Sequence, residues 1–316
     1  VIITADVVSS KTGLTIDNPT TGLNIYDKDQ AMVSLSGPAS VMEGTGGIRE
    51  VNFIVTLDKA TAGPFKVNYE TFDGSASSAD NDYVSNIGEL YFAGKAGEKD
   101  TITVQINTDY KIEGPETFGI RLTGLTENFD DRLVIAAPAS HVVEILNDDL
   151  GVISITPGNG SENGPSSASF RFDFLNDVYS EASTVINFRL DGTAKGQDYT
   201  GAGITSVTIP AGMKTYILEL PVIDDNIAEG TETIVLTPGT VGSPFSPHAL
   251  TVDNSPHNLD ITDNDQATLR IADAKVTEGE GTTTISFDVT LDRATENPIV
   301  VNYSVTDVST TAGEDY

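Results

Sequence analysis

The 316-residue chain contains no cysteine, no tryptophan and only three histidines. Without cysteine, neither a disulfide framework nor a thiolate metal site can form, so stability must come from packed cores or from oxygen-ligated ions. Basic residues are also scarce: 17 Lys and Arg stand against 47 Asp and Glu, a formal net charge of −30. This balance argues against nucleic acid and anionic membranes as partners and favours divalent cations, although an acidic surface also serves solubility.

Long apolar runs and helical patterns are missing as well. No run approaches the roughly 18 apolar residues of a spanning helix, so we expect no membrane insertion by this segment. The chain starts at Val1 without a signal-like stretch, which favours a piece of a longer protein. Val, Ile, Thr and Gly are frequent and no heptad pattern is visible, which predicts an all-β class.

The strands are predicted from a period of two. Val51, Phe53 and Val55 alternate with polar residues, and so do Ile102 and Val104. This alternation is typical of half-buried strands, and Gly and Pro between the strands supply turns. About seven strands per unit are expected, as in an immunoglobulin-like β-sandwich.

Internal repeats set the organisation of the chain. Residues 52–69 read NFIVTLDKATAGPFKVNY, and residues 286–303 read SFDVTLDRATENPIVVNY. Asp82, Asp198 and Asp315, each directly before a Tyr that we expect to be buried, are 116 and 117 residues apart (198−82, 315−198). We therefore predict tandem units in an elongated array: the C-terminal part of one unit (1–29), two complete units (30–149 and 150–265) and the N-terminal part of another (266–316).

The most acidic stretch is IDDNIAEGTET, residues 223–233, with Asp224, Asp225, Glu229 and Glu232. Unit charges a few Å apart repel by roughly 1 kcal/mol in water and by more near a protein surface, so such a loop needs a cation. Calcium takes about 6 to 8 oxygen ligands, which suits a loop without Cys or His. The sequence therefore predicts Ca²⁺ as the bound cofactor.

The order of these motifs resembles one family. DDNIAEGTET, followed by a strand and a terminal DxD, with VxEG and GxDY upstream, is similar to the Calx-beta repeat. That family is named for the regulatory domains of sodium/calcium exchangers and is frequent in bacterial surface and adhesion proteins and in integrin β4. The resemblance implies a sandwich of about seven strands with calcium bound at one end, near the junction with the next unit.

The resemblance also implies which residues bind metal. In the second complete unit they are Glu162, Asp198, Asp224, Asp225, Glu229, Glu232, Asp263 and Asp265. In the first they are Glu43, Asp82, Asp109, Glu113, Glu116, Asn147 and Asp149, and weaker binding is expected there because Thr108 and Asn147 replace acids. The partial units keep Glu278, Asp315, Asp27 and Asp29. Residues distant in sequence, such as Glu162, Asp198, Asp225 and Asp265, are expected to converge at one end of the sandwich.

These expectations favour a structural function: a calcium-stiffened stalk segment of a long extracellular or cell-surface adhesin or filament. Its partners would be neighbouring repeats and a ligand at a distant tip. The alternatives are a calcium-sensing regulatory module and a ligand-binding module that uses the variable loops 123–140 and 239–258. A paired-carboxylate enzyme of the glycosidase type is not expected, because the acids recur at repeated positions and no aromatic cleft for sugar is evident.

Overall fold

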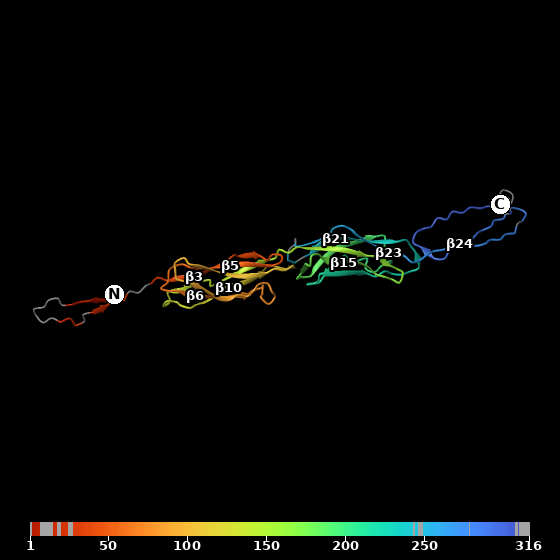
Figure 1. Cartoon of the computed structure of the whole chain (residues 1–316). Helices are drawn as coiled ribbons and strands as arrows, with labels where there is room; N and C mark the ends of the chain where they lie inside the picture. The colour runs from red at the N-terminus through yellow and green to blue at the C-terminus, as the bar shows by residue number, and fades with distance from the viewer. Residues whose placement is uncertain are drawn as a thin grey trace. The chain divides into compact units, whose positions relative to one another are not determined.

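The computed structural model describes residues 2–6, 15–17, 20–24, 28–242, 244–245, 249–277, 279–306 and 309. All regular secondary structure in these residues is β-strand, which confirms the predicted all-β class (Figure 1). None of them belongs to a helix long and apolar enough to cross a membrane. Two compact units are formed, the first from residues 1–109 and 115–148 and the second from residues 110–114 and 149–316.

The first unit is a sandwich of two sheets. The five-stranded sheet has the order β4 (Ser40–Met42), β12 (Ser140–Leu146), β10 (Glu116–Leu125), β6 (Phe65–Asp73) and β7 (Ile87–Phe92). The four-stranded sheet has the order β11 (Leu133–Ile135), β3 (Ala31–Ser36), β5 (Ile48–Leu57) and β8 (Lys99–Asn107). The pairs β4–β12 and β11–β3 are parallel and the others are antiparallel. Outside the sandwich, β1 (Ile2–Thr4) pairs with β2 (Thr20–Gly22).

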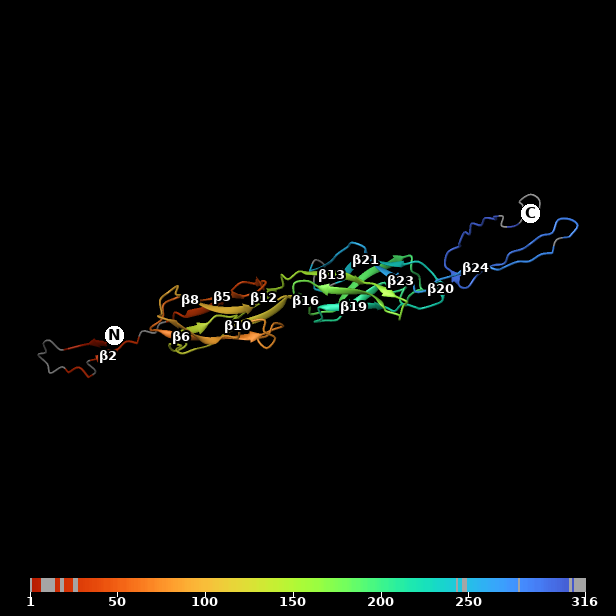
Figure 2. The same cartoon turned by 45° about the vertical axis from the view of Figure 1, so that its right-hand side comes forward.

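The second unit repeats this topology strand for strand. Its five-stranded sheet has the order β14 (Gly160–Ser161), β23 (His257–Thr262), β21 (Glu232–Gly242), β17 (Thr184–Gly192) and β18 (Ser206–Ile209). Its four-stranded sheet has the order β22 (Leu250–Val252), β13 (Gly151–Gly158), β15 (Ala168–Phe174) and β19 (Thr215–Leu220). Among the strands of this unit, β13, β21 and β23 are labelled in Figure 2.

Sheets of five and four strands exceed the expected seven strands per unit. The first strand of each sandwich is divided: Gly37 and Pro38 separate β3 from β4, and Asn159 separates β13 from β14. In both sandwiches the two parts of the divided strand pair in different sheets. At the break between β3 and β4, Pro38 lacks the backbone N–H that a continuous ladder of hydrogen bonds requires. The short strands β11 and β22 add one edge strand to each sandwich.

Alternating apolar side chains form the core of each sandwich. In β5 the predicted inward residues Val51, Phe53 and Val55 are at most 2% exposed, so the predicted alternation is confirmed. The rings of Tyr83 and Phe118 stack there with their centroids 4.5 Å apart. The core of the second unit includes Phe170, Phe172 and Leu236.

Three two-stranded sheets complete the second unit. They pair β9 (Lys111–Ile112) with β16 (Tyr179–Ser180), β20 (Ile227–Ala228) with β26 (Ala294–Thr295), and β24 (Leu269–Ile271) with β25 (Val289–Leu291). Ile112 of β9 is fully buried in the core of this unit. The first two pairs are parallel, and each joins an acidic loop to a segment 68 or 67 residues later in the chain (179−111, 294−227).

Candidate metal centres

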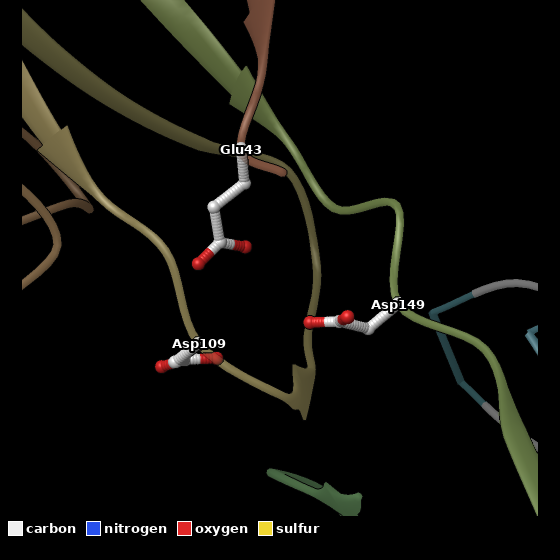
Figure 3. A group of neighbouring side chains, drawn as sticks. All are labelled: Glu43, Asp109 and Asp149. Carbon is white, nitrogen blue, oxygen red and sulfur yellow. The ribbon is translucent and has the colours of Figure 1, made fainter. Parts of the chain in front are cut away.

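An acidic residue follows each of three strands that end close together in the first sandwich. Glu43 directly follows β4, Asp109 lies two residues after β8, and Asp149 lies three residues after β12. Figure 3 shows their carboxylates directed toward a common space, and one oxygen from each lies within 4.8 Å of the others. The backbone N–H of Glu43 donates to Leu146 O at 2.9 Å, which holds the end of β4 beside the end of β12.

A second group consists of Asp82, Glu113 and Glu116, again with one oxygen of each within 4.8 Å of the others. Asp82 precedes Tyr83, which is 2% exposed and forms a β-bridge with Ile106. The tyrosine therefore anchors the aspartate near the end of β8. The prediction that this Tyr is buried is confirmed, and so is the same prediction for Tyr199, which is 3% exposed.

The second unit contains two groups built in the same way. One contains Glu162, directly after β14, with Asp263 and Asp265 after β23; the other contains Asp198, Glu229 and Glu232. Within each group the ligand oxygens lie within 4.8 Å of one another. The groups adjoin, because the backbone N–H of Glu229 donates to Asp263 Oδ2 at 2.7 Å.

These carboxylates are buried to a degree that is unusual for charged residues. Glu162 is 2% exposed and Glu232 is 6% exposed, and the Oε2 atom of each has no hydrogen-bond partner. Burial first, and then the neighbouring Asp263, raises the pKa of Glu162 to about 7. Burial and the neighbouring Asp198 raise the pKa of Glu232 to about 8. Burial and Asp198 likewise raise the pKa of Glu229 to about 7.

The donor set identifies the class of ion that fits. All four groups offer only carboxylate oxygen, which hard cations prefer. Two ligands on opposite sides of a Ca²⁺ ion are separated by about twice the 2.3 to 2.6 Å coordination distance, or roughly 5 Å. An oxygen separation within 4.8 Å matches this span. The buried, unpartnered oxygens of Glu162 and Glu232 gain the partner that they lack when a cation is bound.

The groups contain twelve of the nineteen residues implied by the family resemblance. The expected convergence of Glu162, Asp198, Asp225 and Asp265 is resolved into two adjoining groups rather than one. Asp225 belongs to neither, but its charge contributes to the raised pKa of Glu162 and of Glu229, and its Oδ1 accepts the backbone N–H of Ile227 at 2.7 Å.

Other predicted ligands lie apart from the carboxylate groups. Asp224 is exposed and its Oδ1 accepts a hydrogen bond from Asn264 at 3.1 Å. Asp29 is exposed too, whereas Asn147 directly follows β12, two residues before Asp149. Asp27, Glu278 and Asp315 lie outside the described residues.

The sequence reasoning missed three charged residues beside the groups. Arg293 forms an ion pair with Asp265, Lys111 forms one with Glu113, and the charge of Glu296 contributes to the raised pKa of Glu229 and Glu232. Arg293 and Glu296 belong to the repeated LDRATEN string, which was used only as a marker of the repeat. Lys111 lies within the acidic loop, between Asp109 and Glu113. A basic residue between acidic ones is the sequence feature that could have indicated this ion pair.

A comparison with protein-family models agrees with the motif order. The Calx-beta domain model matches residues 27–149, 177–244 and 260–316. A search of curated proteins gave no significant match. Among solved structures, the apo-form Calx CBD1 domain is 31% identical, covering 38% of this chain and 100% of that chain, with a TM-score of 0.32. The calcium binding domain CBD12 of CALX1.1 is 22% identical over 66% of this chain and 80% of that one, with a TM-score of 0.32.

Proposed function

Because the chain belongs to the Calx-beta family, we propose that carboxylate groups in both repeats bind Ca²⁺ and that its tandem units form a calcium-stiffened structural segment of a long cell-surface or secreted protein. The observation that carries the calcium assignment is the pair of buried glutamate oxygens, on Glu162 and Glu232, that have no hydrogen-bond partner and belong to groups of closely spaced carboxylates. Leaving such groups buried and unpartnered is costly, and a bound cation offsets that cost.

In the second unit, Glu162, Asp263 and Asp265 would hold one ion, and the adjoining group of Asp198, Glu229 and Glu232 would hold another. Bound calcium would supply positive charge to carboxylates that otherwise repel one another. The protein's contribution is placement: strand ends and the buried Tyr199 hold residues distant in sequence at ligand spacing. Binding of this kind adds to the stability of the folded state by mass action.

The stiffening role is supported by where the last acids of each repeat stand in the chain. Asp149 lies two residues before β13, and Asp265 lies four residues before β24, the first strand of the next repeat. A cation bound by Asp149 would restrain the backbone directly before β13. Without calcium, the same carboxylates repel and the restraint is lost.

A position outside the cell follows from this proposal. Several repeats at a constant period suit a stalk, whose partners are neighbouring repeats and, through a distant tip, a surface or extracellular ligand. Extracellular modules bind calcium at about 10⁻⁴ to 10⁻³ M, so their sites stay filled in calcium-rich fluid. The acids are used for ion binding in this account, and no catalytic role is assigned to them.

A calcium-sensing module is the second candidate, since the family is named for the regulatory domains of exchangers. Affinity separates the two: sensors respond at about 10⁻⁷ to 10⁻⁵ M. Small-angle scattering adds a second criterion, because a stalk segment should become longer and stiffer when calcium is added. Identical scattering profiles with calcium and with chelator would reject the stiffening role while leaving calcium binding intact.

Calorimetric titration of the full chain with calcium tests the assignment. We expect binding in the 10⁻⁴ to 10⁻³ M range for the wild type, and loss of the ion at the group of Asp198, Glu229 and Glu232 in the Asp225→Ala/Glu229→Ala variant. The matched control is Glu219→Gln, which removes an exposed carboxylate from β19 of the same unit. Absence of binding to the wild type at 100-fold higher calcium than this range would reject the calcium assignment.

A further inference from the structure

The acidic loops of the two repeats occupy equivalent positions with one difference in charge. Glu113 and Glu229 are 116 residues apart (229−113), and so are Lys111 and Ile227 (227−111). The backbone at these positions is alike, because β9 and β20 each form a short parallel pair with a later segment. The repeat that has a lysine beside its glutamate therefore differs from the repeat that has an isoleucine there.

The same parallel pairs bring a further glutamate to each loop. Glu181 follows β16, and its backbone N–H donates to Ile112 O at 3.0 Å. Glu296 follows β26, and its backbone N–H donates to Ala228 O at 3.3 Å. Glu113 is the residue after Ile112, so the backbone of Glu181 lies beside that of Glu113. In the same way, Glu229 is the residue after Ala228, so the backbone of Glu296 lies beside that of Glu229.

In the loop that has the lysine, the positive charge is built in. Lys111 Nζ lies 2.5 Å from Glu113 Oε2 and 3.9 Å from Glu181 Oε1. The lysine side chain is 16% exposed and the Glu113 side chain is 6% exposed, so solvent screens this pair only weakly. An ammonium group offers three donors and a full charge, which is what closely spaced carboxylates require.

In the loop that has the isoleucine, no such charge is present. Within the part of the chain that the structure describes, no Lys, Arg or His forms an ion pair with Asp198, Glu229 or Glu232. The ammonium of Lys195 donates to Gly192 O at 2.6 Å instead. Glu232 is 6% exposed and its Oε2 has no hydrogen-bond partner, while the charge of Glu296 adds to the group.

We propose that Lys111 takes the place of a calcium ion at the group of Asp82, Glu113 and Glu116, whereas the equivalent group of Asp198, Glu229 and Glu232 binds the ion, with the negative charge of the exposed Glu296 beside it. This inference rests on the proposed calcium binding. It makes equivalent positions of two repeats unequal: one contains a positive charge of its own, and the other depends on metal for it. Calcium entering the first group would have to displace the ammonium and leave a mostly buried lysine without its partner, which is costly.

A reciprocal exchange tests the proposal, since each repeat already contains the residue that the other would receive. Calorimetric titration of the full chain with calcium should show one ion fewer for Ile227→Lys and one ion more for Lys111→Ile. Glu296→Gln should weaken binding by at least about tenfold, as loss of a supporting residue at a metal site does. Glu181→Gln, its matched control, should leave calcium binding unchanged.

A second measurement needs no metal. In chelator, Ile227→Lys should raise the melting temperature, because the ammonium offsets part of the negative charge of its group, and Lys111→Ile should lower it. Calcium binding by the wild type that neither exchange alters in number, together with unchanged melting in chelator, would overturn this inference and leave the proposed calcium binding standing. A wild-type chain that binds no calcium would overturn both, and the two results are distinguished by the wild-type titration alone.

Discussion

Replacing Glu162 by glutamine should stabilise the calcium-free protein and weaken its response to calcium. The amide keeps the size of the side chain and removes the charge from a group whose oxygens lie within 4.8 Å of one another. At that distance two charges repel by about 1 kcal/mol in a water-like medium and by about 3 kcal/mol at an effective dielectric constant of 20. Asp265 is already paired with Arg293, so the largest repulsion that the variant relieves comes from Asp263, with further contributions from Asp225 and Glu229.

The expected change in melting temperature follows from this energy. For a domain of this size, 1 kcal/mol corresponds to about 4 °C, so Glu162→Gln should raise the calcium-free melting temperature of the second unit by about 4 to 12 °C at pH 8. At pH 5.5 the variant should match the wild type, because Glu162, with a pKa of about 7, is then protonated in the wild type.

Differential scanning calorimetry in chelator and in saturating calcium measures both effects. The variant loses a ligand, so the calcium-induced rise in its melting temperature should be smaller than in the wild type. Glu219→Gln, on the exposed face of β19, serves as the control for charge removal elsewhere in the unit. A lower melting temperature in chelator at pH 8, or a calcium-induced rise equal to that of the wild type, would refute the reasoning.

The remaining predictions concern pH, the core and the anchor of an aspartate. The raised pKa values of Glu162, Glu229 and Glu232, about 7, 7 and 8 against an ordinary 4.5, mean that the folded state retains protons that the unfolded state has released. Calcium-free stability should therefore fall as pH rises from about 4.5 to 8, and stability in saturating calcium should not; melting curves across this range decide the point. Ile112→Ala should destabilise the second unit by about 2 to 5 kcal/mol, as measured by chemical denaturation, because Ile112 is fully buried in its core. Ile87→Ala, at a side chain that is 77% exposed, should change stability by less than about 0.5 kcal/mol, and equal effects of the two would contradict the assignment of Ile112 to the core. Tyr83→Phe removes the hydrogen bond to Asp73 Oδ1, 2.5 Å long, and should cost about 1 to 3 kcal/mol of unfolding free energy; an unchanged denaturation midpoint would show that this bond does not contribute.

Much of the fold could be predicted from the sequence because its signals are local. The alternation through Val51, Phe53 and Val55 reflects the pleat of one strand, and two of the aspartate–tyrosine landmarks contain a buried tyrosine that forms an isolated β-bridge. The division of the first strand was missed, since Gly37 and Pro38 indicate a turn as readily as a crossing between two sheets.

The candidate sites were predicted only in part. Residue types and spacing indicated which acids could bind calcium, but their partition into groups depends on where distant strand ends meet. Asp224 and Asp225 are neighbours in sequence, yet Asp224 is exposed, whereas the charge of Asp225 acts on Glu162 and Glu229. Lys111 and Arg293 were overlooked because a basic residue in an acidic chain is usually solvated, and only their tertiary contacts place them on Glu113 and Asp265.

Calcium binding by buried carboxylates is tested most directly by titrating the wild-type chain with calcium at pH 7.0 in two buffers that differ in ionisation enthalpy. Glu162, Glu229 and Glu232 are partly protonated at that pH, so binding should release protons and the observed heat should differ between the buffers. Equal heats in both buffers, or no heat at all, would contradict the account.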